Sequence, residues 1–130
     1  MATANDVRRA LTTWKRRQFG YGDADCCRFA AHIAGEIIGK DLMAGFAYDD
    51  EVSAYSLVAD HGGLEGLVTA ALGVEPSNYY GNGDPVLVNL PIIGDAMGVA
   101  LSGHAVCLTQ VGMVRIKQRY IIKGWQICPK

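Results

Sequence analysis

The stretch YGDADCCRFA, residues 21–30, decides how the chain is organised, because it joins an acidic, glycine-bearing turn to the start of a helix. Asp25 is a residue type favoured at the N-cap position. The apolar residues that follow recur at intervals of three and four, which predicts a helix ending near Gly39. Cys26 then lies in the first helical turn, and Cys27 points about 100° away from it, toward the packing side.

Helical patterns fill the first half of the chain on both sides of this stretch. Residues 5–17 predict an amphipathic helix that begins near Asn5 or Asp6 and turns Trp14 inward. A third helix is expected from about Asp50, carrying Val52, Tyr55 and Val58 and stopped by the sequence HGG at 61–63. A shorter fourth helix is expected over 64–72.

From Pro85 onward the pattern changes to short β-prone runs separated by glycine, aspartate or proline. The runs are PVLVNL, AMGVALS, HAVCLTQV, MVRIKQ and YIIKGWQI. Helices first and strands second are typical of an α+β domain with an antiparallel sheet, here of about five strands. No internal repeat or linker divides the sequence, so we expect a single domain over residues 1–130.

Composition and charge exclude several classes of protein. The chain has 130 residues, 12 basic and 13 acidic side chains and a net charge of -1, so we expect no specific nucleic-acid binding. No apolar run reaches the roughly 18 residues of a membrane span, and the N-terminus lacks the order of a signal peptide. We therefore expect synthesis in the cytoplasm and no membrane span.

Five of the basic residues fall within the first seventeen positions, which favours a solvated helix face over a polyanion site. They are Arg8, Arg9, Lys15, Arg16 and Arg17. If this helix were instead a docking surface, the chain would be a cytosolic binding or regulatory domain.

The four cysteines, at positions 26, 27, 107 and 128, contain no CxxC pair. A disulfide between sequence neighbours is strained, so we expect reduced thiols. The cysteines and histidines also lack the paired spacing of structural zinc sites, and GNGDP precedes a β-prone run where a phosphate loop would precede a helix. We therefore expect no metal and no cofactor.

Cys26 occupies a position that suits a nucleophile, because the first turn of a helix stabilises a thiolate. A buried structural cysteine is the alternative. A nucleophilic cysteine also needs a base. Of the three histidines, His32 lies on nearly the opposite side of the same helix, His61 ends the third helix, and His104 begins a predicted strand. His104 is the best candidate of the three.

The order of these motifs resembles that of the NlpC-type cell-wall cysteine peptidases, which have a papain-like α+β fold. Their Asp-Cys-Ser-Gly-Phe motif corresponds here to residues 25–29, DCCRF, and their Gly-Asp-aliphatic motif to Gly83, Asp84 and the strand that follows. More closely, the chain resembles small phage-encoded proteins of the same superfamily that occur with tail genes. Trp14, FGYGDADC, GDPVLV, GVAL and GWQI match that group along nearly the whole chain.

The histidine of the peptidases can be placed in two ways. One alignment sets their His-Val-Gly-Ile strand on AMGVALSG, which puts Ala96 at the position of the base and leaves His104 beside a turn. The other sets it on HAVCLTQVG and makes His104 the base, with Gln118 as one candidate for the third group. The first alignment keeps the later strands in better register, and the second keeps a histidine at the position of the catalytic base.

The resemblance implies two functions. In the first, the protein is a structural component at or near the tip of a phage tail, located in the virion, with other tail-tip proteins as partners and a degenerate active site. In the second, Cys26 and His104 form the catalytic pair of an endopeptidase or amidase that cuts the peptide stems of peptidoglycan during DNA entry.

Overall fold

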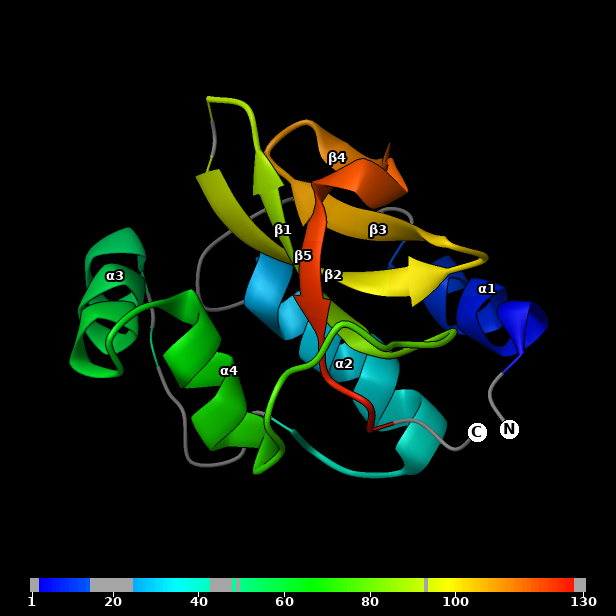
Figure 1. Ribbon diagram of the computed structural model, residues 1–130, viewed down its shortest axis with the longest axis horizontal. Helices are drawn as coiled ribbons and strands as arrows, with labels where there is room; N and C mark the ends of the chain where they lie inside the picture. Colours follow the sequence, from blue (N-terminus) through cyan, green and yellow to red (C-terminus); the bar gives the residue numbers. More distant parts are fainter. Residues whose placement is uncertain (1–2, 15–24, 43–47, 49, 93, 128–130) are drawn as a thin grey trace.

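The computed structural model describes residues 3–14, 25–42, 48, 50–92 and 94–127. Four helices precede five strands, so the α+β class predicted from the sequence is confirmed (Figure 1). The helices are α1 (Ala4–Thr12), α2 (Cys26–Ile38), α3 (Glu51–Asp60) and α4 (Leu64–Leu72). The strands are β1 (Pro85–Leu90), β2 (Gly94–Leu101), β3 (His104–Thr109), β4 (Gly112–Ile116) and β5 (Ile121–Gly124), with a short 3-10 helix, η1 (Gln118–Tyr120), before β5.

The helices α2 and α3 begin where the sequence predicted, at Asp25 and Asp50, and α2 ends at the predicted Gly39; the cap of α1 is Thr3, where Asn5 or Asp6 was predicted. The side chains of Asp25 and Asp50 accept backbone hydrogen bonds at the first turns of α2 and α3, and Gly39 ends α2 in the left-handed conformation. The helix α1 begins at Ala4 after a Thr3 cap and ends at Thr12, and residues 15–17 of the predicted helix lie outside the described part. The longest helix, α2, has 13 residues, and no helix in the described ranges could cross a membrane.

All five strands form one antiparallel sheet in the order β4-β3-β2-β1-β5. β1 pairs with β2 along its whole length, from Pro85 opposite Val99 to Leu90 opposite Gly94. β2 pairs with β3 only from Val99 to Leu101, so the part of β2 that contains Met97 has no partner on that side. This gap in the sheet lies where the N-terminus of α2 approaches.

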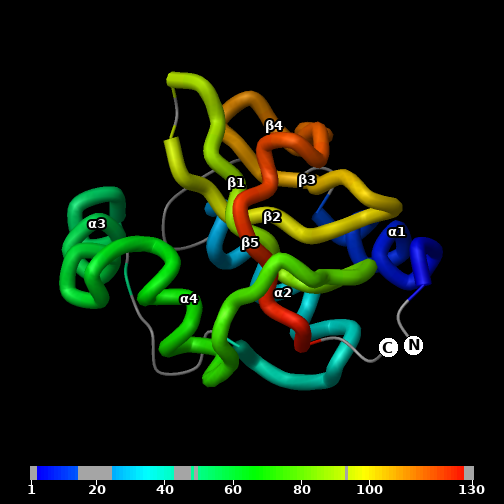
Figure 2. Tube along the Cα trace, viewed as in Figure 1, coloured from blue at the N-terminus to red at the C-terminus, as the bar shows by residue number. Residues whose placement is uncertain are grey.

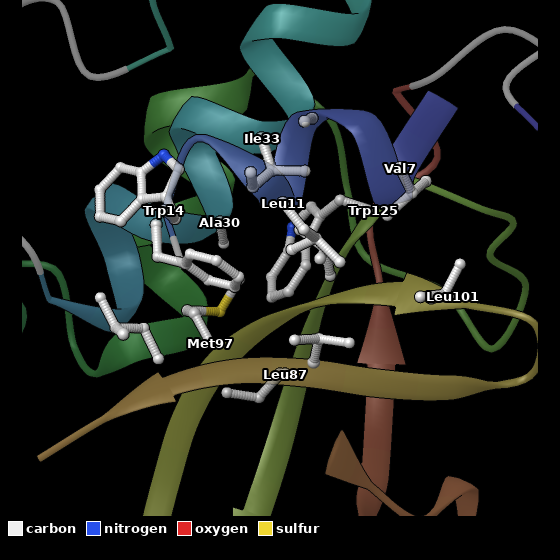
Figure 3. Close-up of a cluster of buried hydrophobic side chains, with 14 of the residues drawn as sticks. Val7, Leu11, Trp14, Ala30, Ile33, Leu87, Met97, Leu101 and Trp125 are labelled. Atoms are coloured by element: carbon white, nitrogen blue, oxygen red, sulfur yellow. The ribbon is translucent and has the colours of Figure 1, made fainter. Parts of the chain in front are cut away.

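One face of the sheet is covered by α2 and α1, and the main core lies between them (Figure 3). Trp14 is buried there, as the sequence predicted, and packs its indole edge against the Phe29 ring at a centroid distance of 5.5 Å. Leu87 and Met97 reach this core from β1 and β2. Because side chains alternate along a strand, their neighbours point to the other face.

That second face is also buried, because the sheet curls. A smaller cluster on it contains Val86, Val88, Ala96, Ala100 and Cys107, among others. Residues of β4 and β5, which are the opposite edges of the sheet, both pack against this cluster. A flat sheet of five strands could not bring its two edges to one small cluster. Most residues on both faces of β1 and β2 are therefore buried. Cys26 packs against both clusters.

The helix α3 forms where the sequence predicted it, but its apolar side chains do not enter the core. It has no buried residue, and Val52 and Tyr55 are 75% and 59% exposed. Figure 2 shows why: α3 lies at the periphery, and α4 stands between it and the rest of the chain. The apolar spacing of α3 predicted its helical form correctly but not its burial.

Candidate functional site

Asp25 fixes the position of Cys26. Its Oδ1 accepts hydrogen bonds from the Arg28 backbone N–H at 2.9 Å and from the Tyr48 hydroxyl at 2.7 Å, and the side chain is 3% exposed. Burial and this bond to the carboxylate raise the pKa of Tyr48, so the phenol stays a hydrogen-bond donor. The first turn of α2 is thereby held in place, with Cys26 as its first residue.

The Cys26 thiol has donors of its own. A hydrogen bond from the Cys27 thiol, together with one from the Met97 backbone N–H, holds the pKa of Cys26 below its ordinary value, although burial and the Asp25 charge act in the opposite direction. The unpaired segment of β2 leaves the Met97 N–H available for this bond. The site therefore stabilises a thiolate at Cys26.

Cys27 has the packing position that its helical spacing predicted. It packs against the main core and lines a cavity of about 30 Å³ with apolar residues of α2 and α4, among them Ala30 and Leu67. Its hydrogen bond to Cys26 and its burial raise the pKa of Cys27 well above the ordinary value. Of the adjacent pair, Cys26 is the thiol that ionises first.

The residue next to Met97 is Ala96, which is 6% exposed and belongs to the cluster against which Cys26 packs. This is the position at which the first of the two alignments places the base. A methyl group neither accepts nor donates a proton, so this position supplies no acid–base help to Cys26.

His104 lies elsewhere. It begins β3 opposite Leu101, at the far end of the β2–β3 pairing from the segment that contacts Cys26. Met97 and Leu101 are four residues apart, which corresponds to about 13 Å along a strand. Burial and the nearby Arg115 lower the pKa of His104. The structure does not bring Cys26 and His104 together, and Gln118 is exposed in η1.

The other two histidines have structural partners. His32 Nδ1 accepts a hydrogen bond from Trp14 Nε1 at 2.6 Å, and His61 Nδ1 lies 2.9 Å from the Leu57 carbonyl oxygen at the end of α3. The groups that chiefly set the pKa of Cys26 are Cys27, the Met97 backbone and Asp25, together with burial. Within the described residues, no group of three or more histidine, cysteine, aspartate or glutamate side chains could hold a metal ion.

The Gly-Asp motif has a structural role that sequence reasoning missed. Asp84 is 1% exposed, and its two carboxylate oxygens accept backbone hydrogen bonds from Gly81 at 2.8 Å and Ile127 at 3.0 Å. The Trp125 N–H donates to the Pro85 carbonyl at 3.0 Å, which extends the same connection. Asp84 thus links the segment after β5 to the start of β1 through hydrogen bonds. The short GWQI motif was the available signal for this contact.

The site as a whole is a cysteine whose pKa is lowered, a buried carboxylate at the preceding position, and an alanine in the strand segment that contacts it. No curated protein matches the chain. A family model described as "Domain of unknown function (DUF6950)" matches residues 2–127, and the chain belongs to this family.

Proposed function

We propose that this protein is a structural component of a phage tail, at or near the tail tip, and that its domain is an NlpC-type papain-like fold used for assembly. The observation that carries the proposal is that an alanine, Ala96, precedes Met97 in the strand segment that contacts Cys26, and belongs to the cluster against which Cys26 packs. A cysteine peptidase needs a base that takes the thiol proton and later protonates the leaving amine. Here Ala96 and the Met97 backbone occupy the neighbouring strand, and His104 lies at the other end of the pairing.

The chemistry supports an assembly role over turnover. The lowered pKa of Cys26 provides thiolate, but attack on an amide also requires protonation of the departing nitrogen. Loss of general acid–base help costs about 10²- to 10⁴-fold in rate. The resemblance to tail-associated proteins supplies the setting, namely the virion, with other tail-tip proteins as partners.

Co-expression tests this proposal. The full chain is produced with the tail-tip and tape-measure proteins of the phage whose genome encodes it, and complexes are isolated by size-exclusion chromatography. We expect a stable complex that survives Cys26→Ala, because assembly does not need the thiol. A folded chain that elutes alone in every combination would contradict the proposal.

A second candidate, an active peptidoglycan endopeptidase or amidase, is favoured by the lowered pKa of Cys26. In that case Cys26 attacks the amide carbonyl and His104 serves as base after a rearrangement of the β2–β3 end. Both Cys26→Ala and His104→Ala would then abolish release of stem peptides, while His61→Ala would not. Equal peptide release by all three variants and by wild type would exclude this candidate.

A further inference from the structure

A surface cleft of about 470 Å³ lies on the side of α2 that faces Trp14, and the proposed function does not use it. Its volume falls within the range of roughly 300–1,000 Å³ typical of ligand sites. Three of its side chains, Arg28, His32 and Glu36, follow one another at intervals of four residues and therefore lie along one helical face. Trp14 contributes an aromatic wall.

Arg28 is a positioned cation that lacks an anion. Its guanidinium lies over the Tyr48 ring, 4.8 Å from the centroid, and its Nε is buried with no hydrogen-bond partner. The ion pairs of the described residues, Arg9–Asp6 and Lys123–Glu65, do not include Arg28. A buried donor without an acceptor is costly, so this side chain favours an external acceptor.

His32 supplies a second donor one turn further on. The indole N–H of Trp14 can only donate, so His32 Nδ1 must be the acceptor of their 2.6 Å bond. The neutral imidazole then carries its proton on Nε2. Residues four apart on a helix are about 5–6 Å apart, so Arg28 and His32 can bracket one small anion.

We infer that this cleft binds the carboxylate of a peptide segment, with Arg28 and His32 as the donors. Arg–carboxylate bonds are charge-assisted and match in geometry. Glu36 lies eight residues beyond Arg28, about 12 Å along the helix, and Asp41 also lines the cleft. Lys40 lines the cleft as well, so its wall carries charges of both signs. Such a wall favours a ligand that itself carries both charges, and a peptide with a carboxylate and a cation fits this description better than phosphate.

The test uses the full chain and the peptide acetyl-Lys-Ala-Ala-Glu-amide, titrated by isothermal calorimetry and by NMR of the Trp14 indole N–H. We expect saturable binding, at least tenfold weaker binding of the counterpart that ends in Gln, and weaker binding of inorganic phosphate. Arg28→Gln should weaken peptide binding at least tenfold. The control Arg115→Gln, an exposed arginine of β4, should leave it unchanged.

Several results would overturn the inference: absence of saturable peptide binding, equal binding of the Glu and Gln peptides, tighter binding of phosphate, or full affinity in Arg28→Gln. If Arg28→Gln does not fold, His32→Gln replaces it, with the same tenfold criterion. The inference goes beyond the proposed function and does not involve the thiol. Cys26→Ala should therefore bind the peptide like wild type, whatever the tail co-expression shows.

Discussion

Two carboxylates, those of Asp25 and Asp84, are the buried charged side chains of the described structure, and they organise their surroundings differently. Asp84 binds backbone N–H groups from two segments, one of them 43 residues away. Asp25 binds the N–H of its own helix, three residues on, and the hydroxyl of Tyr48. One carboxylate joins distant parts of the fold, and the other caps one helix.

The two carboxylates therefore have different roles: Asp84 stabilises the scaffold, and Asp25 positions the candidate site. Asp84 accepts hydrogen bonds from the backbone N–H groups of Gly81 and Ile127, so it holds the start of β1 and the segment after β5 together. Around Asp25 the partners leave the Cys26 thiol and the Arg28 guanidinium to interact with other groups. Asp84 thus holds distant segments together, while Asp25 fixes the first turn of α2, where Cys26 lies.

The largest expected effect is that of Asp84→Ala. The change leaves two buried N–H groups without acceptors, and each costs about 1–3 kcal/mol, so the free energy of unfolding should fall by about 2–6 kcal/mol. Urea unfolding followed by circular dichroism measures it. Asp84→Asn, which keeps one carbonyl acceptor, should lose less. An unchanged midpoint for Asp84→Ala would remove the basis of the comparison.

Asp25→Ala should have a smaller effect on stability, because it removes one cap and one side-chain partner. Loss of an N-cap costs about 0.5–2 kcal/mol. Tyr48→Phe is the matched variant, since it removes only the hydroxyl that donates to Asp25. The same urea experiment ranks the variants. A greater loss in Asp25→Ala than in Asp84→Ala would reverse our assignment of scaffold and site.

Thiol alkylation sharpens the description of the site. The pKa of Cys26 is lowered, whereas burial raises the pKa of Cys107 to about 12. At pH 7.5 iodoacetamide should therefore modify Cys26 roughly a hundredfold or more faster than Cys107, by mass spectrometry of a Cys128→Ser background. Because the Asp25 charge raises the pKa of Cys26, Asp25→Asn should speed the reaction further. Equal rates for Cys26 and Cys107 would contradict this ranking of the thiols.

The last prediction concerns stability at alkaline pH, where the effect develops only over several pH units. Cys107 has a folded-state pKa of about 12 against an ordinary value of 9.0, so above pH 9 the unfolded chain loses this proton first. The contribution is complete below pH 9 and declines as pH rises toward 12, by at most about 1.4 kcal/mol per pH unit. Cys107→Ala should reduce the slope of stability against pH between 9 and 10.5. An identical slope would mean that the burial of Cys107 does not oppose its ionisation.

The elements of the fold follow from local signals in the sequence. Asp25, Asp50 and Gly39 are capping residue types at the helix ends, and PVLVNL reads as a strand without any tertiary context. The burial of α3 could not be predicted in this way, because exposure depends on which helix lies between α3 and the core. Neither could the role of Asp84, whose partner Ile127 is remote in sequence.

The position of the cysteine in the candidate site could be predicted from the sequence, but the position of a partner histidine could not. The cap at Asp25 places Cys26 in the first turn, and the structure confirms that placement. The sequence could not show which strand lies opposite Cys26. AMGVALS and HAVCLTQV both have the apolar pattern of buried strands, and each can be aligned with the histidine-bearing strand of the peptidases. The hydrogen bond from the Met97 backbone to Cys26 shows that the AMGVALS segment lies beside the thiol, and the pairing of His104 with Leu101 places His104 away from it.

The central claim is that Cys26 keeps the position of a nucleophile but has no general base to take its proton. The most direct measurement is the release of stem peptides from purified peptidoglycan by wild type and by Cys26→Ala, quantified by mass spectrometry at several pH values. We predict the same background release from both proteins at every pH. Release by wild type that disappears in a folded Cys26→Ala variant would contradict the claim and make the protein a peptidase.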